Sequence, residues 1–142
     1  MKILVVGGGG REHAIIKKIK QNPNVETIYA LPGNGGIAED AQCVDIGAKE
    51  IDKITQFAVE HAIDFAIVAP DDPLVLGAVD QLQQAGIPCF GPQKNAAMIE
   101  GSKVFAKQLM KKYGIPTARY EVFDQAQQAL EYLKTAPCPT VI

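Results

Sequence analysis

Four consecutive glycines, Gly7-Gly8-Gly9-Gly10, stand near the start of the chain and are followed at once by Arg11-Glu12-His13. Residues 2–6 before them form an apolar run of β type, and a helical pattern begins after them. Glycine lets the backbone approach a ligand closely, and the first amide groups of a helix point at bound anions. The order of strand, glycine loop and helix therefore predicts a site for a phosphorylated small molecule.

Two common phosphate-binding motifs do not fit this loop. A dinucleotide fingerprint needs a third glycine and an acid about 20 residues further on. The third position is Glu12 or His13, depending on the starting glycine, and the second predicted strand ends without an acid. A P-loop is excluded because no Gly-Lys-Ser/Thr follows. A tight turn without any ligand remains the alternative.

No other group of residues suggests catalysis or metal binding. Cys43, Cys89 and Cys138 are far apart, and we expect them to be small buried side chains in a reducing cytosol. His13 and His61 form no metal-binding pattern, and we interpret His61 as structural. The sequence therefore predicts neither a catalytic residue nor a metal ligand.

Length and composition narrow the function further. The 142 residues suit one domain plus part of a second, and they are 47% hydrophobic and 21% charged. The net charge of −2 argues against nucleic acid as a partner. No apolar stretch approaches the roughly 20 residues of a membrane span, and no signal peptide is evident. We expect a cytoplasmic protein without a membrane partner.

Alternating strand and helix patterns must position the glycine loop. They predict an α/β fold with a doubly wound parallel sheet. Strands are expected at residues 2–6, 25–30, 43–46, 65–69 and 88–91, and helices at 11–21, 50–61 and 74–85. Ligands of such sheets bind outside the carboxyl ends of the strands. The glycine loop, the loop 32–36 and the loop 70–73 should all lie there.

The pattern changes after residue 92. Helices are predicted at 94–100, at 103–113 with Ser102 as N-cap, and at 125–134 with Asp124 as N-cap. Strands are predicted at 120–123 and 139–142. The chain stops inside that last strand, which suggests a cut through a second domain. We expect one domain over residues 1–100 and the start of another over residues 101–142.

Several motifs, taken in order, carry a family resemblance. They are Gly8-Gly9-Gly10-Arg11-Glu12-His13-Ala14, Pro32-Gly33-Asn34, Phe90-Gly91-Pro92, Glu100-Gly101-Ser102-Lys103, Phe105-Ala106-Lys107 and Tyr113-Gly114-Ile115-Pro116-Thr117. Together they resemble the phosphoribosylamine–glycine ligases, also called glycinamide ribonucleotide synthetases. The resemblance covers the whole chain.

The resemblance implies a Rossmann-like pre-ATP-grasp domain followed by the start of an ATP-grasp domain. Such ligases join glycine to 5-phosphoribosylamine in the second step of purine biosynthesis. They use ATP with Mg²⁺ or Mn²⁺ and pass through glycyl phosphate. The metal ligands and most of the ATP site are expected beyond Ile142. The resemblance therefore implies that this chain alone is inactive.

The resemblance also implies roles for the residues of the glycine loop. The amides of Gly8, Gly9 and Gly10 would bind the sugar-phosphate end of phosphoribosylamine. Arg11 would pair with the phosphate or remain solvated. Glu12 would accept ribose hydroxyl groups or serve only as a helix-end charge. Asn34 would contact the substrate, or it would serve only the turn in which it lies.

Two further candidates come from the resemblance. Pro70 and Asp71 occupy a position where the family commonly has Gly-Pro-Glu, and here the sequence is Ala69-Pro70-Asp71. Asp71 keeps the charge but is one methylene shorter, so its contact with substrate is in doubt. Lys103 resembles a nucleotide-contacting lysine of ATP-grasp enzymes, or it belongs to the exposed face of its helix.

Two alternative functions remain. The chain could be a noncatalytic module that binds a sugar phosphate or a nucleotide, although its open-ended last strand argues against that. It could instead belong to another pre-ATP-grasp ligase of biotin carboxylase or carboxyaminoimidazole type. The sequence Arg11-Glu12-His13-Ala14 argues against this second alternative.

Overall fold

The computed structural model describes residues 1–141, and within them a parallel sheet of five strands is built in the order β3-β2-β1-β4-β5. The strands are β1 (Lys2–Gly7), β2 (Thr27–Pro32), β3 (Gln42–Cys43), β4 (Phe65–Val68) and β5 (Cys89–Phe90). Every pairing is parallel. The predicted α/β fold with a doubly wound sheet is confirmed.

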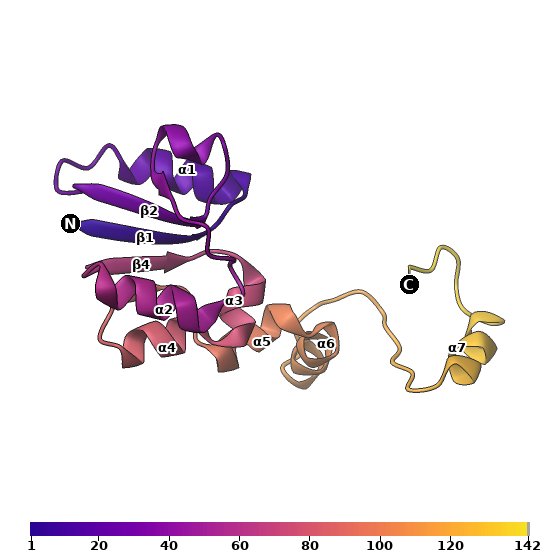
Figure 1. The fold of residues 1–142 in the computed structure, drawn as a ribbon. Coiled ribbons are helices and arrows are strands. Elements are labelled where there is room, and N and C mark those ends of the chain that lie inside the picture. The colour runs from indigo at the N-terminus through magenta and orange to yellow at the C-terminus, as the bar shows by residue number, and fades with distance from the viewer. Residues whose placement is uncertain (142) are drawn as a thin grey trace. The chain divides into compact units, whose positions relative to one another are not determined.

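Helices cover both faces of this sheet, as Figure 1 shows. Helix α1 (Gly10–Ile19) lies on one face, and α2 (Ile51–Glu60) and α4 (Ala78–Gln84) lie on the other. The remaining elements of residues 1–102 are η1 (Ile37–Glu39), α3 (Asp71–Leu76) and α5 (Lys94–Gly101). A sheet buried on both faces requires apolar strands, which explains the uninterrupted apolar run of β1.

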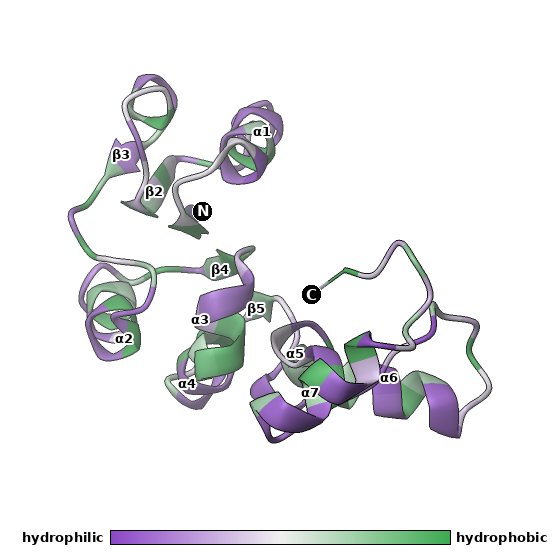
Figure 2. Ribbon diagram, turned by 90° about the vertical axis from the view of Figure 1, so that its right-hand side faces the viewer, coloured by the Kyte–Doolittle hydropathy of each residue, from purple (hydrophilic) through white to green (hydrophobic). Residues whose placement is uncertain are grey.

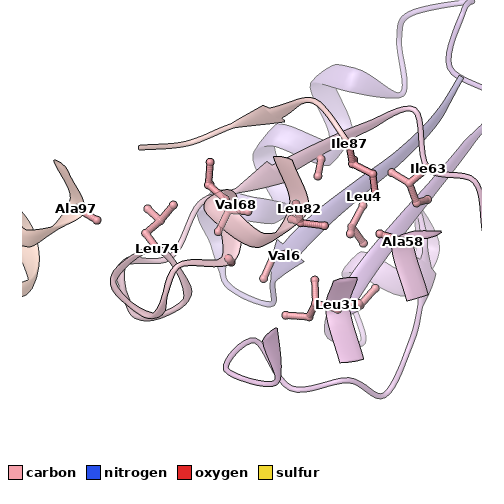
Figure 3. Packing of buried hydrophobic residues seen from close by; sticks show 14 residues of the cluster. Leu4, Val6, Leu31, Ala58, Ile63, Val68, Leu74, Leu82, Ile87 and Ala97 are labelled. Carbon is pink, nitrogen blue, oxygen red and sulfur yellow. The ribbon is translucent and has the colours of Figure 1, made fainter. Parts of the chain in front are cut away.

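The side chains of β1 alternate between two cores. Leu4 and Val6 point into the cluster formed with α2, α3 and α4, where both are fully buried (Figure 3). Ile3 and Val5 point to the other face, where they pack with Ile16 of α1. Successive side chains of a strand face opposite sides. The side chains of this one short strand therefore pack against helices on both faces of the sheet, directly before the glycine loop in the chain.

Several predicted boundaries in this part are wrong. The helix predicted at 74–85 is two helices, α3 and α4, because Gly77 adopts the left-handed conformation with φ +96°. The predicted loop 70–73 is mostly helical, since α3 begins at Asp71 with Pro70 as its N-cap. Proline is tolerated in the first turn of a helix, where its missing N–H costs nothing, and Pro73 uses that freedom. The third strand is also shorter and earlier than predicted.

Residues 103–142 form a second compact unit. It contains α6 (Lys103–Lys112) and α7 (Ala126–Leu133), and none of its described residues is buried. The strand predicted at 120–123 is not formed. Residues 139–141 of the other predicted strand are not extended into a ladder either, and Ile142 lies outside the described residues. A strand requires a neighbouring strand to satisfy its backbone groups, and these segments have none among the described residues.

The cysteines and His61 have mixed outcomes. Cys43 and Cys138 are exposed, so the expectation that all three cysteines are buried is wrong. Cys89 is half-buried, and this burial raises the pKa of its thiol to about 11. The structural interpretation of His61 is confirmed, because its ring stacks on Phe57 with ring centroids 3.8 Å apart. Within residues 1–141, no helix is long and apolar enough to cross a membrane.

Candidate functional site

Three loops meet at the carboxyl ends of β1, β2 and β4. The sheet order places β4 beside β1 on the side away from β2, and Val6 is in register with Val68. The direction of strand addition therefore reverses at β1, which is where open parallel sheets bind ligands. The loops that follow the three strands carry the glycine run, Asn34 and Pro70. Eight of the nine predicted site residues lie within five positions of a strand end at this edge, and the ninth is Lys103.

The glycine loop needs glycine at two positions for different reasons. Gly7 has φ +124°, and a Cβ built there would lie 2.7 Å from Cγ of Glu12 and 2.9 Å from Cγ of Pro70. A Cβ on Gly8 would lie 2.5 Å from the carbonyl oxygen of Gly33. A side chain at either position would push neighbouring loops apart. By contrast, a Cβ on Gly10 meets nothing within 4 Å, so the start of α1 is open.

Asn34 ties the loop after β2 to the glycine loop. Its Nδ2 donates a hydrogen bond of 2.7 Å to the carbonyl oxygen of Gly8, and its Oδ1 accepts one of 2.9 Å from the amide of Ile37. The amide of Gly33 donates to the carbonyl oxygen of Gly7 at 3.2 Å. Asn34 thus does more than complete its own turn, because it fixes the spacing between two loops of the site.

Glu12 lies beneath the glycine loop rather than on the surface. Its side chain is in the first turn of α1, only 3% of the residue is exposed, and Oε2 accepts a hydrogen bond of 2.6 Å from the amide of Gly9. This contact is the acidic half of a capping box, and the other half is missing because Gly9 has no side chain. Among the described residues, the buried Oε1 has no hydrogen-bond partner.

The start of α1 leaves amide groups facing outward. The first hydrogen bond into the helix runs from the amide of His13 to the carbonyl oxygen of Gly9, at 3.1 Å. The amides of Gly10 and Arg11 precede it, so they have no acceptor in the helix. The Arg11 side chain is exposed beside them. Free amides, the positive end of the helix dipole and a guanidinium together favour an anion.

Pro70 and Asp71 form the third side of the site. Pro70 packs against the backbone of Gly7, and Asp71 is the first, exposed residue of α3. A carboxylate in this position is stabilised by the helix dipole without any ligand. Asp71 also borders a hollow of about 290 Å³, whose lining includes Lys49, Asp72 and Glu100. Lys49 forms an ion pair of 2.5 Å with Asp72 in this lining.

Lys103 belongs to the second compact unit. It is the first residue of α6 and is exposed. A hollow of about 1060 Å³ in this unit is lined by the end of α6, residues 114–122 and Tyr132. It contains none of the predicted site residues. Because almost all of its lining is exposed chain, we interpret it as open space between unpacked segments rather than a formed pocket.

Sequence reasoning missed one cluster beside the site. Nε2 of His13 lies 3.0 Å from Oδ2 of Asp40, and Nζ of Lys20 lies 3.0 Å from Oδ1 of the same residue. These hydrogen bonds from His13 and Lys20 hold the pKa of Asp40 below its ordinary value of 3.8. No local signal announces the cluster, because Asp40 is 27 residues from His13. Among residues 1–141, no group of three or more His, Cys, Asp or Glu side chains is arranged to hold a metal ion.

Comparisons with known proteins agree with this arrangement. The family model "Phosphoribosylglycinamide synthetase, N domain" matches residues 1–100, and the model of the ATP-grasp (A) domain of the same synthetase matches residues 101–142. A phosphoribosylamine–glycine ligase of Caldanaerobacter subterraneus subsp. tengcongensis is 56% identical over 142 residues, which are 100% of this chain and 34% of that protein. The chain spans about a third of the length of such curated relatives.

Solved structures show the same fold. The phosphoribosylamine–glycine ligase of Thermotoga maritima matches with a TM-score of 0.73 and 28% identity, over 98% of this chain and 32% of that one. The N5-carboxyaminoimidazole ribonucleotide synthetase of Thermotoga maritima matches with a TM-score of 0.66 and 21% identity, over 92% of this chain and 35% of that one. This second likeness shows a shared fold alone.

Proposed function

The chain belongs to the phosphoribosylglycinamide synthetase family, and from this premise we propose that it supplies the sugar-phosphate site of a ligase. The ligase joins glycine to 5-phosphoribosylamine and gives glycinamide ribonucleotide, in the second step of purine biosynthesis. Glycine is first activated as glycyl phosphate at the expense of ATP, and the amine of phosphoribosylamine then attacks it. Such chemistry depends on positioning and on charge stabilisation rather than on a protein nucleophile.

The observation that carries the proposal is the open start of α1 at the edge where β1, β2 and β4 end. Its outward amides and the empty space above Gly10 suit a phosphate group. We assign the phosphate to the amides of Gly8, Gly9 and Gly10, with Arg11 as its charged neighbour. The amide of Gly9 is engaged by Glu12, so its assignment requires this bond to be exchanged for a bond to the ligand.

We assign the other residues by the contacts that they already make. Glu12 has one carboxylate oxygen without a partner, and we propose that a ribose hydroxyl group donates to it once the loop opens. Asn34 holds the two loops together through Gly8. Pro70 supports Gly7, and Asp71 stands where a substrate contact from the third loop would arise.

We infer that residues 1–100 and residues 101–142 belong to different domains of this ligase. The boundary between the two family models supports this division, and so does the separation into compact units between Ser102 and Lys103. Lys103 begins the second part, and we assign it to the nucleotide. We place the Mg²⁺ or Mn²⁺ ion and most ATP contacts in the two thirds of the relatives that this chain does not span. The chain alone is therefore expected to bind but not to catalyse.

We propose a cytoplasmic location for this ligase. All three cysteines are free thiols in the structure, and two of them are exposed. Free thiols persist in reducing compartments.

Titration of the ¹⁵N-labelled chain with ribose 5-phosphate tests the site. We expect weak binding, with chemical-shift changes at the amides of residues 8–12 and at Asn34. Gly9→Val should abolish these changes, because its new side chain would collide with the carboxylate of Glu12, whose Oε2 lies 2.7 Å from the Cβ position. Lys103→Ala should bind like the wild type, since Lys103 is assigned to the nucleotide.

Two controls make this titration decisive. Ribose without its phosphate should cause no shifts at residues 8–12, and the dispersed spectrum of Gly9→Val should show that the variant is folded. A wild-type chain that shows no shifts around the glycine loop would contradict the proposed site. Equal shifts with ribose and with ribose 5-phosphate would contradict the assignment of these amides to phosphate.

A further inference from the structure

His13 is the residue next to Glu12, and it makes a contact with Asp40 that the proposed function does not use. Its Nε2 lies 3.0 Å from Oδ2 of Asp40, and a Cβ built on Gly36 would lie 3.3 Å from its Cε1. The imidazole side chain is 26% exposed and the Asp40 side chain 18%. Since an ionised carboxylate can only accept, Nε2 carries the hydrogen of this bond. His13 therefore connects the first turn of α1 to the segment that follows β2.

That segment is held at both of its ends. At its start, Asn34 Oδ1 accepts from the amide of Ile37, and the main-chain oxygen of Asn34 accepts from the amide of Ala38 at 3.0 Å. At its end stands Asp40, whose amide donates to the carbonyl oxygen of Ile37 at 2.9 Å. Lys20 adds a second bond to Asp40 at 3.0 Å and Lys17 approaches to 3.9 Å. Hydrogen bonds of Asn34 and Asp40 thus hold the short helix η1 at its two ends.

We propose that His13 is a positioning residue for the sugar-phosphate site. By holding Asp40 it fixes η1 against α1, and through η1 it keeps the amide side chain of Asn34 on the carbonyl oxygen of Gly8. The separation of the glycine loop from the loop after β2 then depends on a side chain that need not touch substrate. The inference rests on the proposed function, because it concerns the same pair of loops.

Hydrogen exchange in the ligand-free chain tests whether the contact of His13 with Asp40 holds η1 in place. His13→Ala should raise the exchange rate of the Ile37 amide by about three- to tenfold, the effect of losing one ordinary hydrogen bond. His13→Gln should restore most of the protection, since its side-chain amide can still donate to Asp40. His61→Ala is the matched control, because His61 is another partly buried histidine but contacts Phe57 at the end of α2. Unchanged exchange at Ile37 in His13→Ala would overturn the proposal.

Affinity for ribose 5-phosphate tests the consequence for the site. His13→Ala should weaken binding by about three- to tenfold, and His13→Gln should bind nearly as well as the wild type. In an Asn34→Ala background, His13→Ala should cause no further loss, because its path to Gly8 is already broken. Losses that multiply in the double variant would show that His13 acts by another route, and they would overturn the proposal.

The two hypotheses fail differently in these experiments. A wild-type chain that does not bind ribose 5-phosphate defeats the proposed function and this inference with it. A wild-type chain that binds, together with a His13→Ala variant of equal affinity, defeats the inference and leaves the proposed function intact. Thermal unfolding of each variant shows whether it is folded at the temperature of the binding experiment. A loss of affinity in a folded variant is then due to the site and not to unfolding.

Discussion

Residues 1–102 and residues 103–142 are two compact units of one chain, and they differ most in the apolar surface that each buries. The first unit encloses a core on each face of its sheet. In the second unit, α6 and α7 contain no buried residue, although hydrophobic and hydrophilic positions alternate along both helices (Figure 2). Short helices draw most of their stability from packing an apolar face. The local pattern therefore specifies helices in both units, but only the first completes a core from its own residues.

The largest expected effect comes from removing a buried leucine from the first unit. Leu82 of α4 is fully buried, and Leu82→Ala should lower the free energy of unfolding by about 3 kcal/mol, through lost transfer energy and the cavity left behind. Leu130→Ala is the matched change in α7, where the leucine is 57% exposed, and it should cost less than about 0.5 kcal/mol. Urea denaturation followed by circular dichroism measures both. Equal losses would break the comparison, because they would place a packed core in the second unit.

A smaller effect sharpens the comparison inside the first unit. Gly8→Ala forces a Cβ to within 2.5 Å of the carbonyl oxygen of Gly33, and backbone cannot move aside as a side chain can. We expect a loss of about 2 kcal/mol, as for other overpacked sites. Gly10→Ala places its Cβ in open space at the start of α1, so it should be neutral or stabilising by up to about 1 kcal/mol. Thermal denaturation distinguishes the two. A tolerated Gly8→Ala would show that the loops are not in contact.

The same contrast explains what the sequence could predict. The run from Ile3 to Val6 is continuous and apolar, so both the strand and its burial on two faces follow from the residues alone. The segment 120–123, Tyr-Glu-Val-Phe, also contains residues that favour strands. A strand forms only beside a partner strand, however, and the local sequence does not show whether a partner exists. Gly77 sits within a helical pattern, and only its left-handed conformation reveals the break between α3 and α4. The sequence predicted an element correctly where the residues that determine that element are close together in the chain.

The site follows the same rule. The glycine run and the helix behind it are adjacent in the chain, so the open helix start was predictable. The burial of Glu12 was not, because the side chain folds back against Gly7, which Pro70 also approaches from far along the chain. Nor was the contact between His13 and Asp40, which depends on how η1 returns to α1. At both positions, the contact that the sequence did not predict joins segments that follow different strands.

The smallest expected effect compares, across pH, the Asp40 cluster of the first unit with an ion pair of the second unit. His13 and Lys20 lower the pKa of Asp40 in the folded chain, so its ionised form stabilises the fold above the ordinary value of 3.8. This stabilisation disappears as the pH falls from 3.8 through the lower folded value. Asp40→Asn should therefore unfold at lower urea concentration than the wild type at neutral pH, and the two midpoints should converge in acid.

Glu131→Gln is the control for Asp40→Asn in the second unit. Glu131 pairs with Lys134 one turn away, and both side chains are about two-thirds exposed, at 65% and 67%. Such surface pairs contribute little, so the urea midpoint should match the wild type at every pH. If Asp40→Asn also matched the wild type at neutral pH, the bonds around Asp40 would contribute no more than this exposed pair. The contact of His13 with Asp40 would then stabilise the first unit no more than the exposed pair of Glu131 and Lys134 stabilises the second.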